Sequence, residues 1–233
     1  WVRGDYYISG ITVSRFFALH VVALPLVLIA LVFLHLVALH EVGAGNPEGV
    51  DIEKYLDDDG VPLDSVPFFP YKVLNALVAI GVFMTVFSII MFFFPEGGGY
   101  FIEMANFQEA NPLVTPDHIA PVWYYAPFYT MLRAIPDPLG GLIVMASAVA
   151  IFFIVPWLDR SKVASIRYKG IYSKIAITMF GVSFLTLGYL GTVGVTEVRK
   201  TMSVICTIIY FAYFLLMPIY TKYETTKEVP ERL

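Results

Sequence analysis

Three of the four histidines in this chain lie within one long apolar stretch, at positions 20, 35 and 40. His20 and His35 are fifteen residues apart, so on a straight α-helix they lie about 22 Å apart along the axis and about 60° apart around it. Neutral imidazole is a common metal ligand, and histidine is an axial ligand of haem iron. The pair therefore predicts two stacked cofactor sites. Hydrogen bonding of each imidazole to a neighbouring helix is the alternative.

The element that must position these histidines is a transmembrane helix. Between Phe16 and Leu39 the sequence has no Asp, Glu, Lys or Arg, and a helix of that length crosses a bilayer. An ionisable group inside a membrane is costly and usually functional. His40 lies five residues beyond His35, about 140° further around the helix. We expect His40 to face the interface or a ligand rather than to act as a third axial ligand.

The composition places the whole chain in a membrane. Of its 233 residues, 58% are hydrophobic and 15% are charged, and the mean hydropathy is +0.73. We predict an all-α integral membrane helix bundle, with prolines 25 and 218 at kinks or breaks. The formal charge of −4 argues against nucleic-acid binding. The single cysteine, Cys206, excludes a disulfide framework and a thiolate metal site. The five predicted spans are residues 14–40, 73–94, 141–158, 172–190 and 202–220.

The charges of the connecting segments predict an orientation. With five crossings, residues 41–72, residues 159–174 and the C-terminal tail share one side and carry ten Lys or Arg, against five on the other side. The positive-inside rule makes that side cytoplasmic. His35 and His40 then lie toward the cytoplasm and His20 toward the outside.

The connection of residues 95–140 is long enough to carry a function of its own. Between Pro121 and Pro136, five of the seven residues at 123–129 are aromatic. This pattern predicts a short helix at the membrane interface, packed around a flat apolar ligand. An aromatic belt that only anchors the loop is the alternative.

These residues resemble cytochrome b of the quinol-oxidising cytochrome bc complexes (complex III). Arg15-Phe16-Phe17-Ala18-Leu19-His20, His35 and His40-Glu41-Val42-Gly43 resemble the fourth transmembrane helix of that family. Further segments resemble its quinol-oxidation loop: Asn111-Pro112-Leu113, Pro116-Asp117-His118-Ile119, Pro121-Val122-Trp123-Tyr124, Leu132-Arg133-Ala134-Ile135-Pro136 and Leu139-Gly140-Gly141. By this resemblance, the five spans are the last five of eight.

The resemblance implies a role for each matching residue. His20 would ligate the iron of the low-potential haem near the outer face, and His35 that of the high-potential haem near the cytoplasmic face. His40 would contact quinone at the inner, reducing site. Arg15, by its charge, would neutralise haem propionates. The quinol-oxidation site would include Pro121, Trp123, Tyr124 and Tyr129.

Two departures from the family pattern concern protons. Val122 stands where the commonest loop motif has a glutamate, so proton exit would need Tyr129, Glu109, Asp117, ordered water or a residue outside this sequence. At the inner site the expected aspartate has no match, and Lys72 or Asn75 would take its place. The fifteen-residue histidine interval is the longer of two seen in the family.

The implied function is electron transfer from quinol to a cytochrome c, with charge separation and proton translocation across the membrane. The cofactors would be two b-type haems, with ubiquinol and ubiquinone as substrates. The partners would be a Rieske iron–sulfur subunit, a cytochrome c-type subunit, a second copy of the complex and membrane lipid, in a bacterial inner membrane. Two rivals are a dihaem cytochrome subunit of a quinone-linked dehydrogenase and a proton transporter with a histidine relay.

This function divides the chain into five parts. They are the haem-ligand helix with its preceding outer segment (1–40), a cytoplasmic-side loop (41–72), a second helix (73–94), the outer quinol-site loop (95–140) and three C-terminal helices with the tail (141–233).

Overall fold

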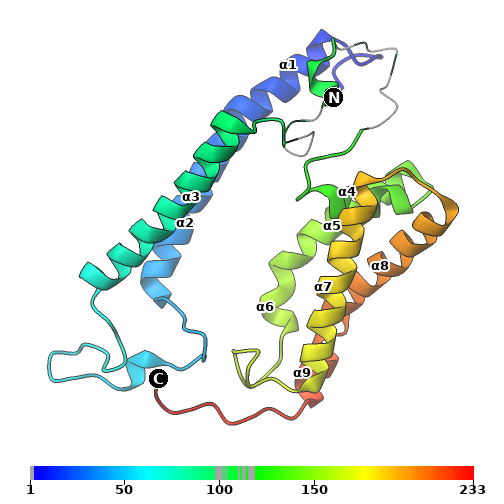
Figure 1. Ribbon diagram of the computed structural model, residues 1–233. Coiled ribbons are helices and arrows are strands. Elements are labelled where there is room, and N and C mark those ends of the chain that lie inside the picture. Colours follow the sequence, from blue (N-terminus) through cyan, green and yellow to red (C-terminus); the bar gives the residue numbers. More distant parts are fainter. Residues whose placement is uncertain (1–2, 98–101, 103, 110, 112–113, 115–118) are drawn as a thin grey trace. The chain divides into compact units, whose positions relative to one another are not determined.

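The computed structural model describes residues 3–97, 102, 104–109, 111, 114 and 119–233 and confirms the all-α fold (Figure 1). It has five helices that are long and apolar enough to cross a membrane. Contacts divide the chain into two compact units, residues 1–46 with 108–117, and residues 47–107 with 118–233. Several motif residues of the expected quinol loop lie outside the described residues, namely Pro112, Leu113, Pro116, Asp117 and His118.

The first unit is built on one helical rod, Gly10–Val42. It comprises α1 (Gly10–Ala18), a π-helical turn η1 (Leu19–Ala23) and α2 (Leu24–Val42). The rod ends at Gly43, whose φ of +74° suits glycine and whose N–H donates to the Leu39 carbonyl at 2.9 Å. The predicted first span, residues 14–40, is thus confirmed as a helix, but it begins four residues earlier and ends two residues later than predicted.

The predicted disturbance at Pro25 takes the form of the wide turn η1. Proline has no N–H, and its ring would clash with the carbonyl of Val21 in a regular α-helix. Leu24, the residue before it, donates its N–H to the carbonyl of Leu19, five residues back. Helix α2 then restarts with Pro25 in its first turn, where an intrahelical donor is not needed.

The second unit contains the other four candidate spans. Its α-helices are α3 (Val73–Phe93), α4 (Ala126–Ala134), α5 (Pro138–Ala150), α6 (Val155–Leu158), α7 (Ile171–Thr192), α8 (Glu197–Leu215) and α9 (Met217–Tyr223). Its short helical turns are η2 (Ile52–Lys54), η3 (Phe68–Lys72), η5 (Met104–Phe107) and η6 (Ile151–Ile154).

The bounds of two further predicted spans were wrong. The third begins at Pro138 because the side chain of Asp137 accepts from the N–H of Gly140 and caps the helix. The fifth begins at Glu197, since the side chain of Thr196 accepts from the N–H of Arg199 at 3.3 Å. It ends at Leu215, and Pro218 lies in the first turn of a separate helix, α9.

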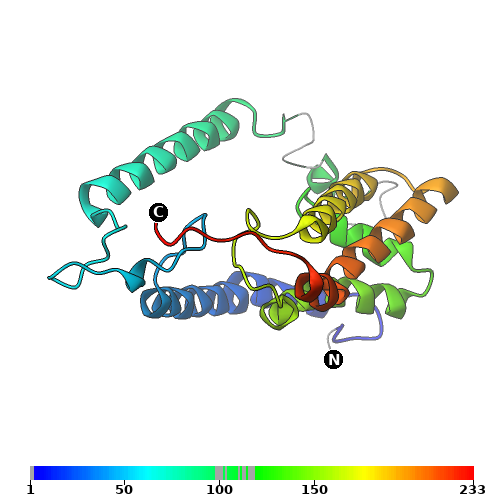
Figure 2. The same cartoon turned by 90° about the horizontal axis from the view of Figure 1, so that it is seen from below.

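The core of the second unit lies among α4, α5, α7, α8 and α9. Figures 1 and 2 show α4 across one end of α5, α7 and α8. Met131, Leu187 and Tyr210 have no exposed surface. The hydroxyl of Tyr210 donates to the carbonyl of Ala148 at 2.8 Å, which satisfies the one polar atom of that buried ring. The core therefore fixes α4 against the longer helices.

At the other end of these helices, three segments distant in sequence lie together. Glu48 accepts hydrogen bonds from Arg167 and Tyr168, and Ser165 donates to the carbonyl of Pro47 at 2.7 Å. In the tail, Lys227 donates its N–H to the carbonyl of Tyr168 at 2.8 Å. The structure thus brings together the segments that the charge count placed on one side.

An ion pair between Asp64 and Arg232 holds the tail and predicts a pH dependence. Two hydrogen bonds, at 2.9 and 3.1 Å, join the carboxylate to the guanidinium. The hydrogen bond from Arg232 lowers the pKa of Asp64 below its ordinary value of 3.8. A carboxylate with a lowered pKa stabilises the fold above its ordinary pKa and loses that contribution as the pH falls through the folded value.

A spin label at Leu233→Cys should therefore be ordered at neutral pH and become mobile only as the pH falls below 3.8, the ordinary pKa of this carboxyl group. With Asp64→Asn it should be mobile throughout. A label equally mobile at pH 7 with and without Asp64→Asn would contradict the tether.

Candidate functional site

The helical rod of the first unit carries His20 in its wide turn and His35 in α2. Both side chains are exposed on the rod. Within the described part of the chain, neither imidazole has a hydrogen-bond partner. Each therefore retains a ring nitrogen that can ligate a metal, as an axial haem ligand requires. The two imidazoles therefore fit the predicted role of ligands to two haem irons.

His40 differs from the other two in its hydrogen bonding. Its Nδ1 lies 2.9 Å from the carbonyl oxygen of Leu36. A carbonyl can only accept, so Nδ1 carries the proton and Nε2 of the neutral ring is an acceptor. The side chain is exposed in the last turn of α2. His40 thus presents one acceptor nitrogen at the end of the rod.

Arg15 lies in the last turn of α1, before the wide turn. Its guanidinium packs against Gly4, where an added Cβ would be 2.9 Å from the guanidinium carbon. Gly4 has a φ of +79°, a conformation that favours glycine. The side chain of Arg15 therefore packs on the N-terminal segment at Gly4. Its role toward haem propionates stays a prediction.

The expected aromatic helix is present as α4, and Pro121–Tyr125 leads into it. Trp123 and Tyr124 are 73% and 52% exposed, and their rings contact each other edge to face at 5.5 Å. Tyr129 lies one turn into α4, with the guanidinium of Arg133 4.5 Å from its ring centre. Trp123 and Tyr124 thus form one aromatic pair, and Tyr129 packs with Arg133. The exposed pair is free to cover a flat ligand.

Polar side chains fasten α4 to α7. The hydroxyl of Thr130 donates to the carbonyl of Leu187 at 2.7 Å. Arg133 donates from Nη2 to the carbonyl of Leu190, also at 2.7 Å. Sequence reasoning missed these roles. The signal was present, since two polar residues three positions apart in an apolar helix lie on the same face.

Small residues allow the helices to approach closely at α4. An added Cβ at Gly191 of α7 would collide with the carbonyl oxygen of Ala126. One at Gly141 of α5 would collide with the carbonyl oxygen of Leu132. Backbone therefore packs directly on backbone at both ends of α4, and this sets the position of the Pro121–Tyr125 segment.

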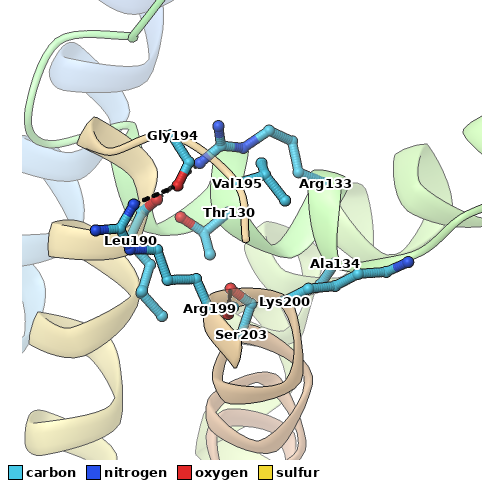
Figure 3. Close-up of a pocket in the computed structure, with 9 residues that line it drawn as sticks. All are labelled: Thr130, Arg133, Ala134, Leu190, Gly194, Val195, Arg199, Lys200 and Ser203. Carbon is cyan, nitrogen blue, oxygen red and sulfur yellow. Dashed lines mark hydrogen bonds between the residues drawn. The ribbon is translucent and has the colours of Figure 1, made fainter. Parts of the chain in front are cut away.

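A small hollow lies beside this contact, between α4, the end of α7 and the start of α8 (Figure 3). Figure 3 shows the guanidinium groups of Arg133 and Arg199 on the side of the α7–α8 connection, with the amine of Lys200 directed away from them. Arg199 donates to the carbonyl of Gly194 at 2.8 Å. Arg199 thus ties the start of α8 to that connection, whereas Arg133 ties α4 to the last turn of α7.

The residues considered for proton transfer are only partly placed. Val122 and Glu109 are exposed, whereas Asp117 lies outside the described residues. Lys72 ends η3, and Asn75 lies in the first turn of α3. Both of these side chains are exposed. Their roles at the two quinone sites stay predictions.

This geometry defines a multi-pass helical membrane protein with an apolar rod, and two imidazoles of that rod have no hydrogen-bond partner in the described part of the chain. The family model described as cytochrome b (N-terminal)/b6/petB matches residues 1–127, and that described as cytochrome b (C-terminal)/b6/petD matches residues 109–211. The chain belongs to the cytochrome b family. Membership implies haem binding.

Individual relatives agree with this assignment. Cytochrome b of Allochromatium vinosum is 50% identical over 241 residues, covering 100% of this chain and 58% of the relative. Cytochrome b/c1 of Bradyrhizobium diazoefficiens is 36% identical, covering 99% of this chain and 32% of the relative. A chain of a solved hyperthermophilic respiratory complex III matches with a TM-score of 0.84 and 32% sequence identity. The match covers 96% of this chain and 55% of the chain in that structure. The chain spans about half the length of the curated relatives that it matches.

Proposed function

We propose that this chain is the cytochrome b subunit of a quinol:cytochrome c oxidoreductase, and that its rod holds two b-type haems. The observation that carries the proposal is the apolar rod Gly10–Val42, in which neither His20 nor His35 has a hydrogen-bond partner among the described residues. His20 would hold the haem iron toward the outer face, and His35 would hold the one toward the cytoplasmic face. Bound there, the haems supply one-electron carriers across the membrane.

The outer reaction is quinol oxidation beside the segment that precedes α4. Trp123 and Tyr124 supply exposed, flat apolar surfaces for a quinol ring. Pro121 restricts the backbone at the start of the segment, and Tyr129 offers a hydroxyl from α4. The lack of an acid at Val122 leaves proton release to Tyr129, Glu109, Asp117 or ordered water.

The inner reaction is quinone reduction beside His40. With Nδ1 held by the Leu36 carbonyl, Nε2 can accept a hydrogen bond from a quinol hydroxyl, or donate one to a quinone oxygen when the ring is protonated. Lys72 or Asn75 would supply the second polar contact. Protons released outside and taken up inside would couple the two reactions to charge separation across the membrane.

The proposal assigns partners and a location as well. One electron per quinol leaves to a Rieske iron–sulfur subunit, which passes it to a cytochrome c-type subunit. The complex is a homodimer in the lipid of a bacterial inner membrane, with ubiquinol and ubiquinone as substrates. The five-part division of the chain, from the rod to the three C-terminal helices, is part of the same proposal.

A redox titration of the purified complex tests this function. We expect a reduced-minus-oxidised absorption spectrum with two b-type signals that reduce at separate potentials, one of them with quinol before dithionite is added. A single signal would favour another cytochrome architecture, and a flat spectrum would leave the histidine-relay transporter. Oxidation of added quinol without reduction of a cytochrome c would favour the dehydrogenase-linked rival.

A further inference from the structure

The wide turn η1 lies between the two predicted haem ligands, and it changes their register. In a regular α-helix the N–H of Leu24 would donate to the carbonyl of His20, but here it donates to Leu19. A turn closed over five residues takes one more residue than a normal turn. The fifteen-residue interval from His20 to His35 therefore does not rotate as an α-helix of that length would.

The size of the change follows from helix geometry. Fifteen α-helical residues place His35 about 60° ahead of His20, and one extra residue absorbed in a turn sets it back by up to about 100°. His20 is the second of the five residues of η1, so most of this correction falls between the histidines. Their azimuth then lies between zero and about −40°, close to that of a fourteen-residue α-helical interval.

We propose that Pro25 is a positioning residue that imposes η1, and that η1 sets the register of the two imidazoles by absorbing one residue of their interval. This inference rests on the proposed function of His20 and His35 as axial ligands. Pro25 acts through the backbone, because it lacks the N–H for the Val21 carbonyl and its ring excludes the regular turn. A bound haem would lie on one side of the rod, so an imidazole rotated by about 100° away from that side would no longer reach the iron.

Two variants, each with fourteen residues from one histidine to the other, test this proposal. They distinguish it from the alternative that only the number of residues in the interval matters. The first combines deletion of Val22 with Pro25→Ala, which removes both the extra residue and the cause of the wide turn. The second deletes Ile29 and keeps Pro25, so that the wide turn remains while the interval shortens. Haem-to-polypeptide ratio and the reduced-minus-oxidised spectrum of the purified complex are the readouts.

We expect the first variant to retain two haems per chain and the second to retain one. Loss of a haem from the first variant would show that the native interval rotates as fifteen regular α-helical residues, and it would overturn the proposal. Two haems in the second variant would show that Pro25 does not hold the turn and would overturn its role. His20→Ala serves as the reference, because two haems in that variant would refute the ligand assignment itself rather than the register.

Discussion

His20→Ala should remove one of two haems from the complex, and His35→Ala should remove the other. The loss should be close to complete, because alanine has no nitrogen with which to ligate the iron. In the redox titration, His20→Ala should abolish the lower-potential signal and His35→Ala the higher-potential one. Quinol oxidation should fall at least 100-fold in either variant, since electron transfer across the membrane is then interrupted.

Val122→Glu provides the matched control for these two variants. Its side chain is exposed on the outer segment, outside the rod, so both haem signals should remain. An acid at this position should also speed proton release while its carboxylate is ionised, so any gain in quinol oxidation should disappear at low pH. Two full haem signals in His20→Ala would contradict the assignment, and loss of a signal in Val122→Glu would show that spectral loss is not specific to the histidines.

The sequence was sufficient for the spans because their apolar runs exceed the thickness of a bilayer. The sequence was not sufficient to place helix ends that depend on a single capping contact. Thr196 caps α8, so the helix includes Arg199 and Lys200 in its first turns. These charged residues lower the local hydropathy, and the predicted span therefore began after them. A pattern of hydropathy therefore finds the membrane-crossing part of a helix more reliably than its polar first turn.

The candidate site also has a part that the sequence predicted and a part that it did not. The sequence predicted that His20 and His35 lie on one helix, and Pro25 predicted a disturbance between them. The form of that disturbance was not readable, because a proline can give a kink, a break or a wide turn, and only the Leu24 to Leu19 hydrogen bond distinguishes them. The register of His20 and His35 thus required coordinates.

The docking of α4 was also hidden from the sequence, and it leads to a prediction about Gly191. Gly191→Val should destabilise the protein by about 1–3 kcal/mol, the usual cost of overpacking. The reason is the added Cβ, which would collide with the Ala126 carbonyl oxygen at the start of α4. Displacement of α4 should also move Trp123 and Tyr124 from a quinol ring. We expect a lower melting temperature and at least a tenfold fall in quinol oxidation.

Gly181→Val in the same helix supplies the control. Within the described residues, nothing lies within 4 Å of a Cβ added at Gly181, so this variant has the same change in helix propensity without the collision. Haem content should stay at two per chain in both variants, because neither changes a residue of the rod. Equal losses of quinol oxidation in the two variants would show that the effect comes from α7 itself. A loss confined to Gly191→Val would establish that the contact of α4 with α7 positions the outer segment.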